Sequence, residues 1–342
     1  MSLGPLMVDV AGTALTDEDR QVLCHPLVGS VILFTRNYQD LPQLRTLVAD
    51  IKALRSPPLL VAVDHEGGRV QRFRQGFSRL PAMRRIGEAY ERDADTGLEM
   101  ARQLGWLMAA ELRNVGIDFS FAPCVDLDYG ASQIIGDRAF HARPDVVGRL
   151  ALATMQGMHK AGMAATAKHF PGHGAVVADS HLDLPVDTRT LVQLTDDIAP
   201  YQPLVAAGLD AVMMAHVLFP QVDAVPASFS HRWVQQVLRS QLGFAGVVFA
   251  DDLSMQGAGA MGDVVARAQG AASAGCDVLP LCNDRAAVLK VLQQWQYAPT
   301  ADTVARIGGL VGRAAGLPED LLASGSHREA LVWLERCNAG SA

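Results

Sequence analysis

Short apolar runs bounded by turn or polar residues recur along the whole chain. Several are apolar nearly throughout instead of alternating, which is typical of strands that are covered on both faces. Eight such runs are present, which is the number that a closed α/β barrel requires. They are Met7–Val10, Val28–Phe34, Leu59–Val63, Phe119–Val125, Met163–Ala167, Ala211–Val217, Gly246–Ala250 and Asp277–Leu281.

Segments with a 3.6-residue apolar period separate these runs, and each indicates an amphipathic helix. After the apolar stripe of Leu98–Val115, Gly116 is a candidate helix C-cap. The alternation of strands and helices predicts an α/β protein with a (β/α)8 TIM-type barrel. The segments are Leu44–Leu54, Leu98–Val115, Val146–Ala161, Val234–Leu242, Val264–Ala274 and Ala287–Trp295.

The spacing of these elements also predicts the domain organisation. The strands occupy about residues 7–283, and a helical tail occupies about 284–338 and should pack outside the barrel. The stretch around residues 70–94 is long enough for an insertion near the active site. Because no linker or composition shift interrupts the 342 residues, we expect a single catalytic barrel domain over 1–342.

Composition narrows the classes of partner. The net charge is −7 and basic residues do not cluster, so a nucleic-acid partner is not expected. Five widely spaced cysteines are typical of a reducing compartment. Neither a secretory signal nor the roughly 18 consecutive apolar residues of a membrane helix is evident. We therefore expect a cytoplasmic protein without a membrane partner, as a monomer or a weak homo-oligomer.

Polar residues gather where the predicted strands end, which is where a barrel of this type carries its chemistry. Asp64, Lys168, His169 and Asp251 all stand at such positions. Asp64 belongs to a charged stretch whose carboxylates and arginines can form bidentate hydrogen bonds with vicinal hydroxyls; a surface ion-pair network is the alternative. Asp251 and Asp252 follow an otherwise apolar strand, where one can act as a nucleophile while the other caps the next helix.

The segment Lys168–Gly174, with the sequence KHFPGHG, is the strongest local signal. His169 and His173 have the spacing of a helical zinc pair, but the proline and glycines between and after them forbid a regular helix. The glycine pattern at 257–262 does not follow a strand directly, so it does not indicate a dinucleotide site. We therefore expect no metal and no cofactor.

A second candidate for chemistry follows on the same loop. In Asp179-Ser180-His181 a carboxylate stands two residues from an imidazole, so it can accept the imidazole N–H, fix the tautomer and raise the basicity of the ring. Such a dyad can donate and retrieve a proton near neutral pH. The alternative is that the pair only holds a surface loop in place, and the two residues alone do not decide between these roles.

Together these motifs resemble the single-domain bacterial β-N-acetylglucosaminidases of glycoside hydrolase family 3. The resemblance runs from about Leu6 to Asn283, with the motifs in order and at similar spacing. It rests on 32–37 (ILFTRN), 64–72 (DHEGGRVQR), 135–140 (IGDRAF), 168–174 (KHFPGHG), 179–181 (DSH) and 249–255 (FADDLSM).

The resemblance implies an exo-acting retaining enzyme of peptidoglycan recycling, with a disaccharide or muropeptide as its small-molecule substrate. It would remove terminal, non-reducing N-acetylglucosamine from 1,6-anhydro-N-acetylmuramic acid, with or without peptide. It also implies Asp251 as the nucleophile, His181 as the acid/base and Asp179 as the residue that orients His181. The implied substrate-binding residues are Asp64, Arg72, Arg138, Lys168 and His169.

Two features bear on this interpretation. His65 stands where the resemblance leads us to expect Gln or Glu, which leaves the subsite there open. Longer relatives draw a glutamate acid/base from a second domain, and we expect no room for one after Asn283, so the loop dyad would supply the proton. A metal-dependent barrel hydrolase, a family-3 glycosidase for another sugar and a non-catalytic sugar-binding barrel are the alternatives.

Overall fold

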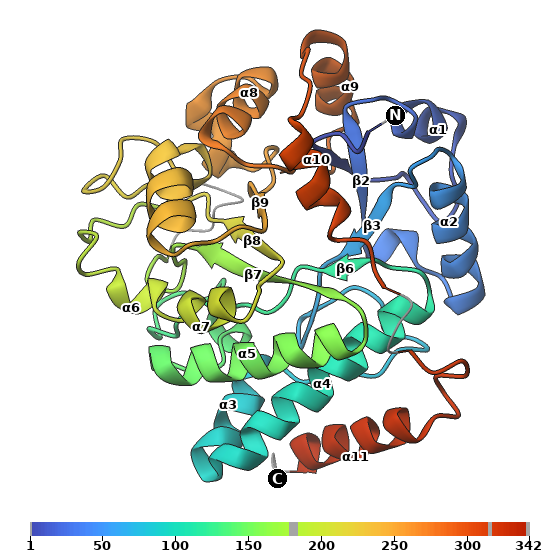
Figure 1. Cartoon of the computed structure of the whole chain (residues 1–342), viewed down its shortest axis with the longest axis vertical. Coiled ribbons are helices and arrows are strands. Elements are labelled where there is room, and N and C mark those ends of the chain that lie inside the picture. Colours follow the sequence, from blue (N-terminus) through green and yellow to red (C-terminus); the bar gives the residue numbers. More distant parts are fainter. Residues whose placement is uncertain (1, 178–183, 314–316, 340–342) are drawn as a thin grey trace.

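Eight parallel strands form the centre of the computed structural model, which describes residues 2–177, 184–313 and 317–339. They pair in the order β10-β1-β2-β3-β6-β7-β8-β9, and a parallel bridge between Phe249 and Val278 joins the two ends of the sheet. The predicted (β/α)8 barrel is therefore confirmed, with helices around the ring of strands (Figure 1). The strands are β1 Leu6–Val8, β2 Val28–Leu33, β3 Leu60–Val63, β6 Phe119–Ser120, β7 Ala164–Phe170, β8 Ala211–Met214, β9 Val247–Phe249 and β10 Leu279–Pro280.

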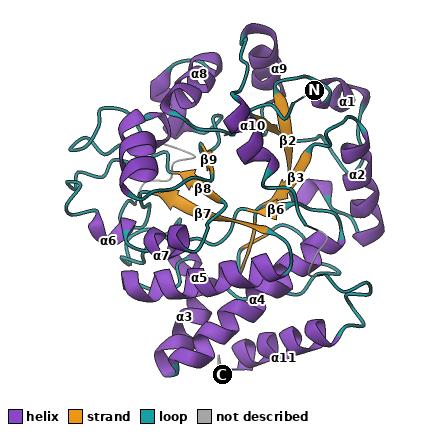
Figure 2. Cartoon of the chain, viewed as in Figure 1, coloured by secondary structure: helices purple, strands orange, loops and turns teal. Residues whose placement is uncertain are grey.

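The helices surround the strands, as the colouring by secondary structure shows (Figure 2). All six predicted helical segments are helical, although η4 is a π-helix and not an α-helix. None of the described helices is long and apolar enough to cross a membrane. The α-helices are α1 Asp17–Leu23, α2 Leu41–Ala53, α3 Met83–Arg92, α4 Ala94–Asn114, α5 Pro144–Lys160, α6 Thr195–Ile198, α7 Tyr201–Ala206, α8 Val264–Ala274, α9 Arg285–Gln294, α10 Ala301–Gly308 and α11 Gly325–Ala339. The 3₁₀ and π segments are η1 Thr35–Asn37, η2 Gly136–Arg138, η3 Ala227–Phe229, η4 Arg232–Gln241 and η5 Gln256–Met261.

Local sequence explains where α4 begins and ends. The side chain of Asp93 caps α4 by accepting a hydrogen bond from the backbone N–H of Thr96 at 2.7 Å. At the other end Gly116 has a φ of +89°, a conformation that glycine adopts without steric cost. Its backbone N–H donates to the carbonyl of Arg113 at 2.9 Å, so this glycine ends the helix as the sequence predicts.

Most strands are shorter than the predicted runs, and two differences from the predicted bounds lie near the cavity-forming ends of β6 and β7. The run expected to continue to Val125 leaves the regular ladder after Ser120, because Pro123 has no N–H to donate. A bridge between Cys124 and Lys168 restores the pairing one residue later. Conversely, β7 continues to Phe170, so Lys168 and His169 are among the last residues of a buried strand and do not lie beyond it.

A short hairpin was not predicted. It consists of β4 (His65–Gly67) and β5 (Val70–Gln71), and it opens the insertion between β3 and β6 that the sequence spacing indicated. The side chain of Gln71 holds the loop that follows, because its amide donates to the carbonyl of Ser78 at 2.9 Å and its carbonyl accepts from the N–H of Leu80 at 3.0 Å. The hairpin thereby places Arg72 beside the carboxyl end of β3.

Aromatic side chains fill the interior of the barrel. Phe119 and Phe249 come from strands that are not neighbours in the sheet, and their ring centroids lie 5.6 Å apart. Phe121 contacts both rings edge to face, at 5.5 and 5.1 Å. These rings separate the two ends of the barrel.

At the amino end of the barrel, aspartates placed just before three strands stabilise the neighbouring strand. Asp118, Asp210 and Asp277 each accept a backbone N–H at 2.9 Å, from Val61, Ala165 and Val248 respectively. Asp277 also forms ion pairs with Arg239 of η4 at 2.8 Å and Arg306 of α10 at 2.6 Å. Since Asp277 is only 2% exposed, it anchors the helical tail to the barrel.

The last helix, α11, packs against α4 and α3 at the outside of the barrel (Figure 1). Its buried His327 contacts the carboxylate of Glu111 in α4, with Nε2 3.1 Å from Oε1. The same carboxylate accepts hydrogen bonds from the hydroxyl and the N–H of Ser78, at 2.7 and 2.9 Å. The helical tail is thus connected through Glu111 to the insertion that follows β5.

We predict that Asp277→Ala lowers the free energy of unfolding by about 3 kcal/mol, because it leaves two guanidinium groups and one strand N–H without their shared partner. Urea denaturation followed by circular dichroism measures the change. Asp302→Ala, at an exposed position of α10, is the matched control. A loss for Asp277→Ala no larger than that of the control would contradict the anchoring role.

Candidate active site

A cavity of about 550 Å³ opens at the carboxyl ends of the strands. Its volume lies in the range of small-molecule sites, and its position is the one at which barrels of this type carry their chemistry. Six of the eight residues that the resemblance selects line this cavity. They are Asp64, Arg72, Arg138, Lys168, His169 and Asp251.

The ammonium group of Lys168 is the centre of the charged wall of the cavity. The residue is only 3% exposed, and its Nζ lies 3.0 Å from Oδ1 of Asp64 and 2.6 Å from Oε1 of Glu66. Nζ also lies 5.8 Å from the centroid of the Phe121 ring. An ammonium group has three protons, so one remains for a ligand oxygen after both carboxylates are bound.

Two arginines complete this network. Arg138 binds Glu66 in a bidentate manner, with Nε 2.9 Å from Oε2 and the second nitrogen 2.8 Å from Oε1. Arg72 lies 3.6 Å from the other oxygen of Asp64. Three cations therefore surround two carboxylates, and a ligand entering the cavity meets groups whose positions are fixed in advance.

The charges determine the protonation states of these carboxylates. Burial raises the pKa of Asp64, but the charges of Lys168 and Arg72 outweigh burial and lower this pKa below its usual value. Burial likewise raises the pKa of Glu66, and the charges of Arg138 and Lys168 reverse the shift, so its pKa lies well below the usual range. Both groups are ionised at neutral pH and act only as hydrogen-bond acceptors.

Asp251 and Asp252 follow β9 closely in the sequence, and both line the cavity. The carboxylate of Asp252 accepts backbone N–H groups from Ser254 at 2.9 Å and from Cys282 at 3.2 Å, so it holds the loop. Asp251 accepts the N–H of Asp252 at 2.9 Å. Burial raises the pKa of Asp252 to about 6. Asp252 therefore holds the loop as well as lining the cavity, and the N-cap of the next α-helix, α8, is Asp263 and not one of these two residues.

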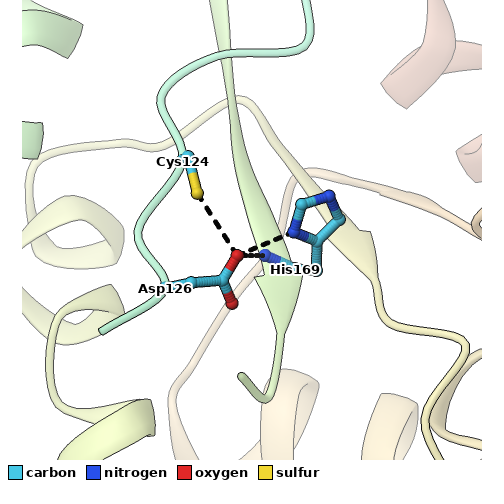
Figure 3. A group of neighbouring side chains, drawn as sticks. All are labelled: Cys124, Asp126 and His169. Atoms are coloured by element: carbon cyan, nitrogen blue, oxygen red, sulfur yellow. Dashed lines mark hydrogen bonds and ion pairs between the residues drawn. The ribbon is translucent and has the colours of Figure 1, made fainter. Parts of the chain in front are cut away.

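The carboxylate of Asp126 holds the end of β7 and the turn that follows it through hydrogen bonds. One of its oxygens, Oδ2, accepts hydrogen bonds from Nδ1 of His169 at 2.7 Å, from the backbone N–H of His169 at 3.3 Å and from the thiol of Cys124 at 3.3 Å (Figure 3). The other oxygen accepts the backbone N–H of His173 at 2.7 Å. His169 therefore keeps its proton on Nδ1 when it is neutral, and its Nε2 is then an acceptor.

The same three side chains have the donor atoms of a metal site. Among the described residues, one sulfur, one oxygen and one nitrogen ligand atom of Cys124, Asp126 and His169 lie within 4.8 Å of one another. Their proximity is explained without an ion, because the carboxylate oxygen already accepts a hydrogen bond from each of the other two. A cation bound here would have to displace the protons of both the thiol and Nδ1.

Comparison with known proteins decides the family. The glycosyl hydrolase family 3 N-terminal domain model matches residues 4–306, which is most of the chain. The chain belongs to glycosyl hydrolase family 3. It is similar to the β-hexosaminidases of Thioalkalivibrio sulfidiphilus, at 56% identity over 92% of this chain and 90% of that protein, and of Bordetella avium, at 56% identity over 89% and 88%.

A solved structure of the family agrees with this assignment. The crystal structure of NagZ from Neisseria gonorrhoeae in complex with N-trifluoroacetyl-D-glucosamine superposes with a TM-score of 0.94, at 44% identity, over 98% of each chain. The chain is therefore a β-hexosaminidase of glycosyl hydrolase family 3. The fold and the enzyme class that the motifs indicated are both confirmed.

Not every predicted residue of this hexosaminidase can be placed. Asp179 and His181 lie outside the described residues, so their assignment as the dyad stays a prediction. Three other residues belong to the site although they were not selected. Glu66 and Asp126 were visible only as polar residues near strand ends, and His173 was considered only as a zinc ligand.

We predict that Asp252→Asn changes the pH dependence of stability. Because the folded state raises the pKa of Asp252 to about 6, wild-type stability declines as the pH rises from 3.8 to about 6. The decline is at most about 3 kcal/mol. Asparagine still accepts the loop N–H groups but has no proton to lose. The free energy of unfolding of the variant relative to wild type, measured with urea, should therefore be more favourable at pH 7 than at pH 4. An equal difference at the two pH values would contradict the assignment.

Proposed function

We propose that the enzyme is an exo-acting retaining β-N-acetylglucosaminidase of peptidoglycan recycling. Its substrate would be N-acetylglucosamine linked to 1,6-anhydro-N-acetylmuramic acid, with or without a stem peptide. The observation that carries this proposal is that Asp251 and the Lys168 network line one and the same cavity. A relative that binds N-trifluoroacetyl-D-glucosamine supports an N-acylated glucosamine as the occupant.

The fixed charges suit the hydroxyl groups of one terminal sugar. Asp64 is an ionised acceptor, while Arg72, Arg138 and Lys168 are donors that their carboxylate partners hold in place. Nε2 of His169 adds an acceptor beside them. Such preorganised groups bind a sugar through its hydroxyls without paying to order their own side chains. A cavity of this size selects the terminal sugar of a substrate, and this selection favours exo action.

The chemical step follows the retaining scheme. The carboxylate of Asp251 attacks C1 and forms a covalent bond, while His181 donates a proton to the departing glycosidic oxygen. His181, now neutral, then removes a proton from a water molecule, whose oxygen attacks C1 and releases Asp251. Asp179 would orient the imidazole and stabilise its charged form. Two inversions at C1 leave the configuration unchanged.

We predict that the enzyme hydrolyses an aryl β-N-acetylglucosaminide in preference to the matching aryl β-glucoside, with rates unchanged by EDTA. Asp251→Asn should lower kcat by roughly 10³-fold or more, because the amide cannot form the covalent intermediate. Release of the aryl alcohol measures both, with Asp302→Asn as the control. Loss of activity in EDTA would favour a metal-dependent hydrolase, and preference for the glucoside would favour another sugar.

We predict that His181→Ala impairs substrates with poor leaving groups far more than those with activated aryl groups, because only the former need a proton. Asp179→Ala should show the same dependence in weaker form. A series of aryl substrates of graded leaving-group pKa gives the comparison. Equal losses across the series would contradict the role of His181 as the acid.

A further inference from the structure

His173 is a part of the cavity wall to which the proposed mechanism gives no role. It lines the cavity and is only 2% exposed. Neither nitrogen of its ring has a hydrogen-bond partner in the described part of the chain. Two other buried histidines there, His65 and His327, do not line the cavity, and Nε2 of His327 lies 3.1 Å from a carboxylate oxygen of Glu111.

The backbone on both sides fixes the position of this ring. Oδ1 of Asp126 accepts the N–H of His173 at 2.7 Å. A Cβ added to Gly174 would lie 1.9 Å from the carbonyl oxygen of Leu127, and one added to Gly172 would lie 2.7 Å from the Cβ of Asp197. Only glycine fits at either position, so the backbone on both sides of His173 is packed closely against neighbouring segments.

The unpaired nitrogens carry a cost in the free enzyme. A buried polar group without a partner costs about 1–3 kcal/mol, and a phenyl ring of similar size would avoid this cost. Burial and the neighbouring charge of His169, whose ring centroid lies 5.9 Å away, both lower the pKa of His173. The neutral ring offers one donor and one acceptor, and both lack a partner among the described residues.

We propose that His173 is a sugar-binding residue that hydrogen-bonds the terminal sugar at the wall of the cavity shared with Asp251. The proposal rests on the proposed function, since it assigns an additional contact within the same sugar site. Rotation of a histidine ring about its Cβ–Cγ bond is soft, so a small turn can bring a nitrogen to the cavity edge. The sugar supplies hydroxyls and an acetamido group, and each can satisfy such a nitrogen.

The test compares His173→Phe with the wild-type enzyme on the aryl β-N-acetylglucosaminide and the aryl β-glucoside. We expect kcat/KM to fall by about 10- to 100-fold, which corresponds to loss of one hydrogen bond to a buried group. The melting temperature should stay the same or rise, because the change removes an unsatisfied group. A larger loss on the acetamido substrate identifies that group as the partner, and equal losses identify a ring hydroxyl.

Thr166→Val is the matched control. Thr166 is a buried residue of β7 whose hydroxyl also lacks a partner in the described chain, but it does not line the cavity. This variant should retain wild-type kcat/KM. If folded His173→Phe also stays within twofold of wild type on both substrates, the proposal is wrong. If wild-type enzyme cleaves neither substrate, the proposed function fails instead.

Two amide variants keep the test decisive if His173→Phe does not fold. Asparagine places its amide near the position of Nδ1, and glutamine places it near Nε2, so each reproduces one ring nitrogen. Calorimetric titration with N-acetylglucosamine should then show unequal affinities, with one variant within about threefold of wild type and the other weakened by about 10-fold or more. Equal affinities for the two variants would overturn the proposal.

Discussion

The ammonium group of Lys168, buried between the carboxylates of Asp64 and Glu66, is the interaction on which the rest of the site depends. A buried cation is tolerated only if acceptors surround it, and two carboxylates so close together are tolerated only if cations separate them. Each group therefore fixes the positions of the others, and Arg138 extends this constraint to the loop that carries η2. Because Lys168 lies on β7 and Asp64 follows β3, the register of the barrel itself sets the geometry that a sugar would meet.

The barrel uses aspartate in two opposite ways at its two ends. At the amino end Asp118 and Asp277 are satisfied by backbone N–H groups and by Lys or Arg side chains, and their function is to hold strands and helices together. At the carboxyl end Asp251 and Asp64 line a cavity, where their charges face the space that a ligand fills. The residue type is the same, and the difference comes from whether the side chain faces packed elements of the fold or lines a cavity.

The sequence was sufficient for the order of the elements, because each buried strand of a parallel barrel is a short continuous apolar run that its flanking polar residues delimit. The hairpin of β4 and β5 could not be predicted, since its strands, with the sequences HEG and VQ, contain no apolar run. Positions at strand ends identified Asp64 and Asp251, because chain topology brings such ends together. The partnership of Glu66 with Arg138 was not predictable, since these residues are far apart in the sequence and meet only through the fold.

His169, near the end of β7, and His173, in the turn that follows, show why pairing must be counted atom by atom. A carboxylate has about four acceptor sites. In Asp126 these sites receive Nδ1 and the N–H of His169, the thiol of Cys124 and the N–H of His173. Three of these donors share Oδ2 and one binds Oδ1, and neither ring nitrogen of His173 is among them. One imidazole is held by the protein, and the other has hydrogen-bonding capacity that a bound sugar can satisfy.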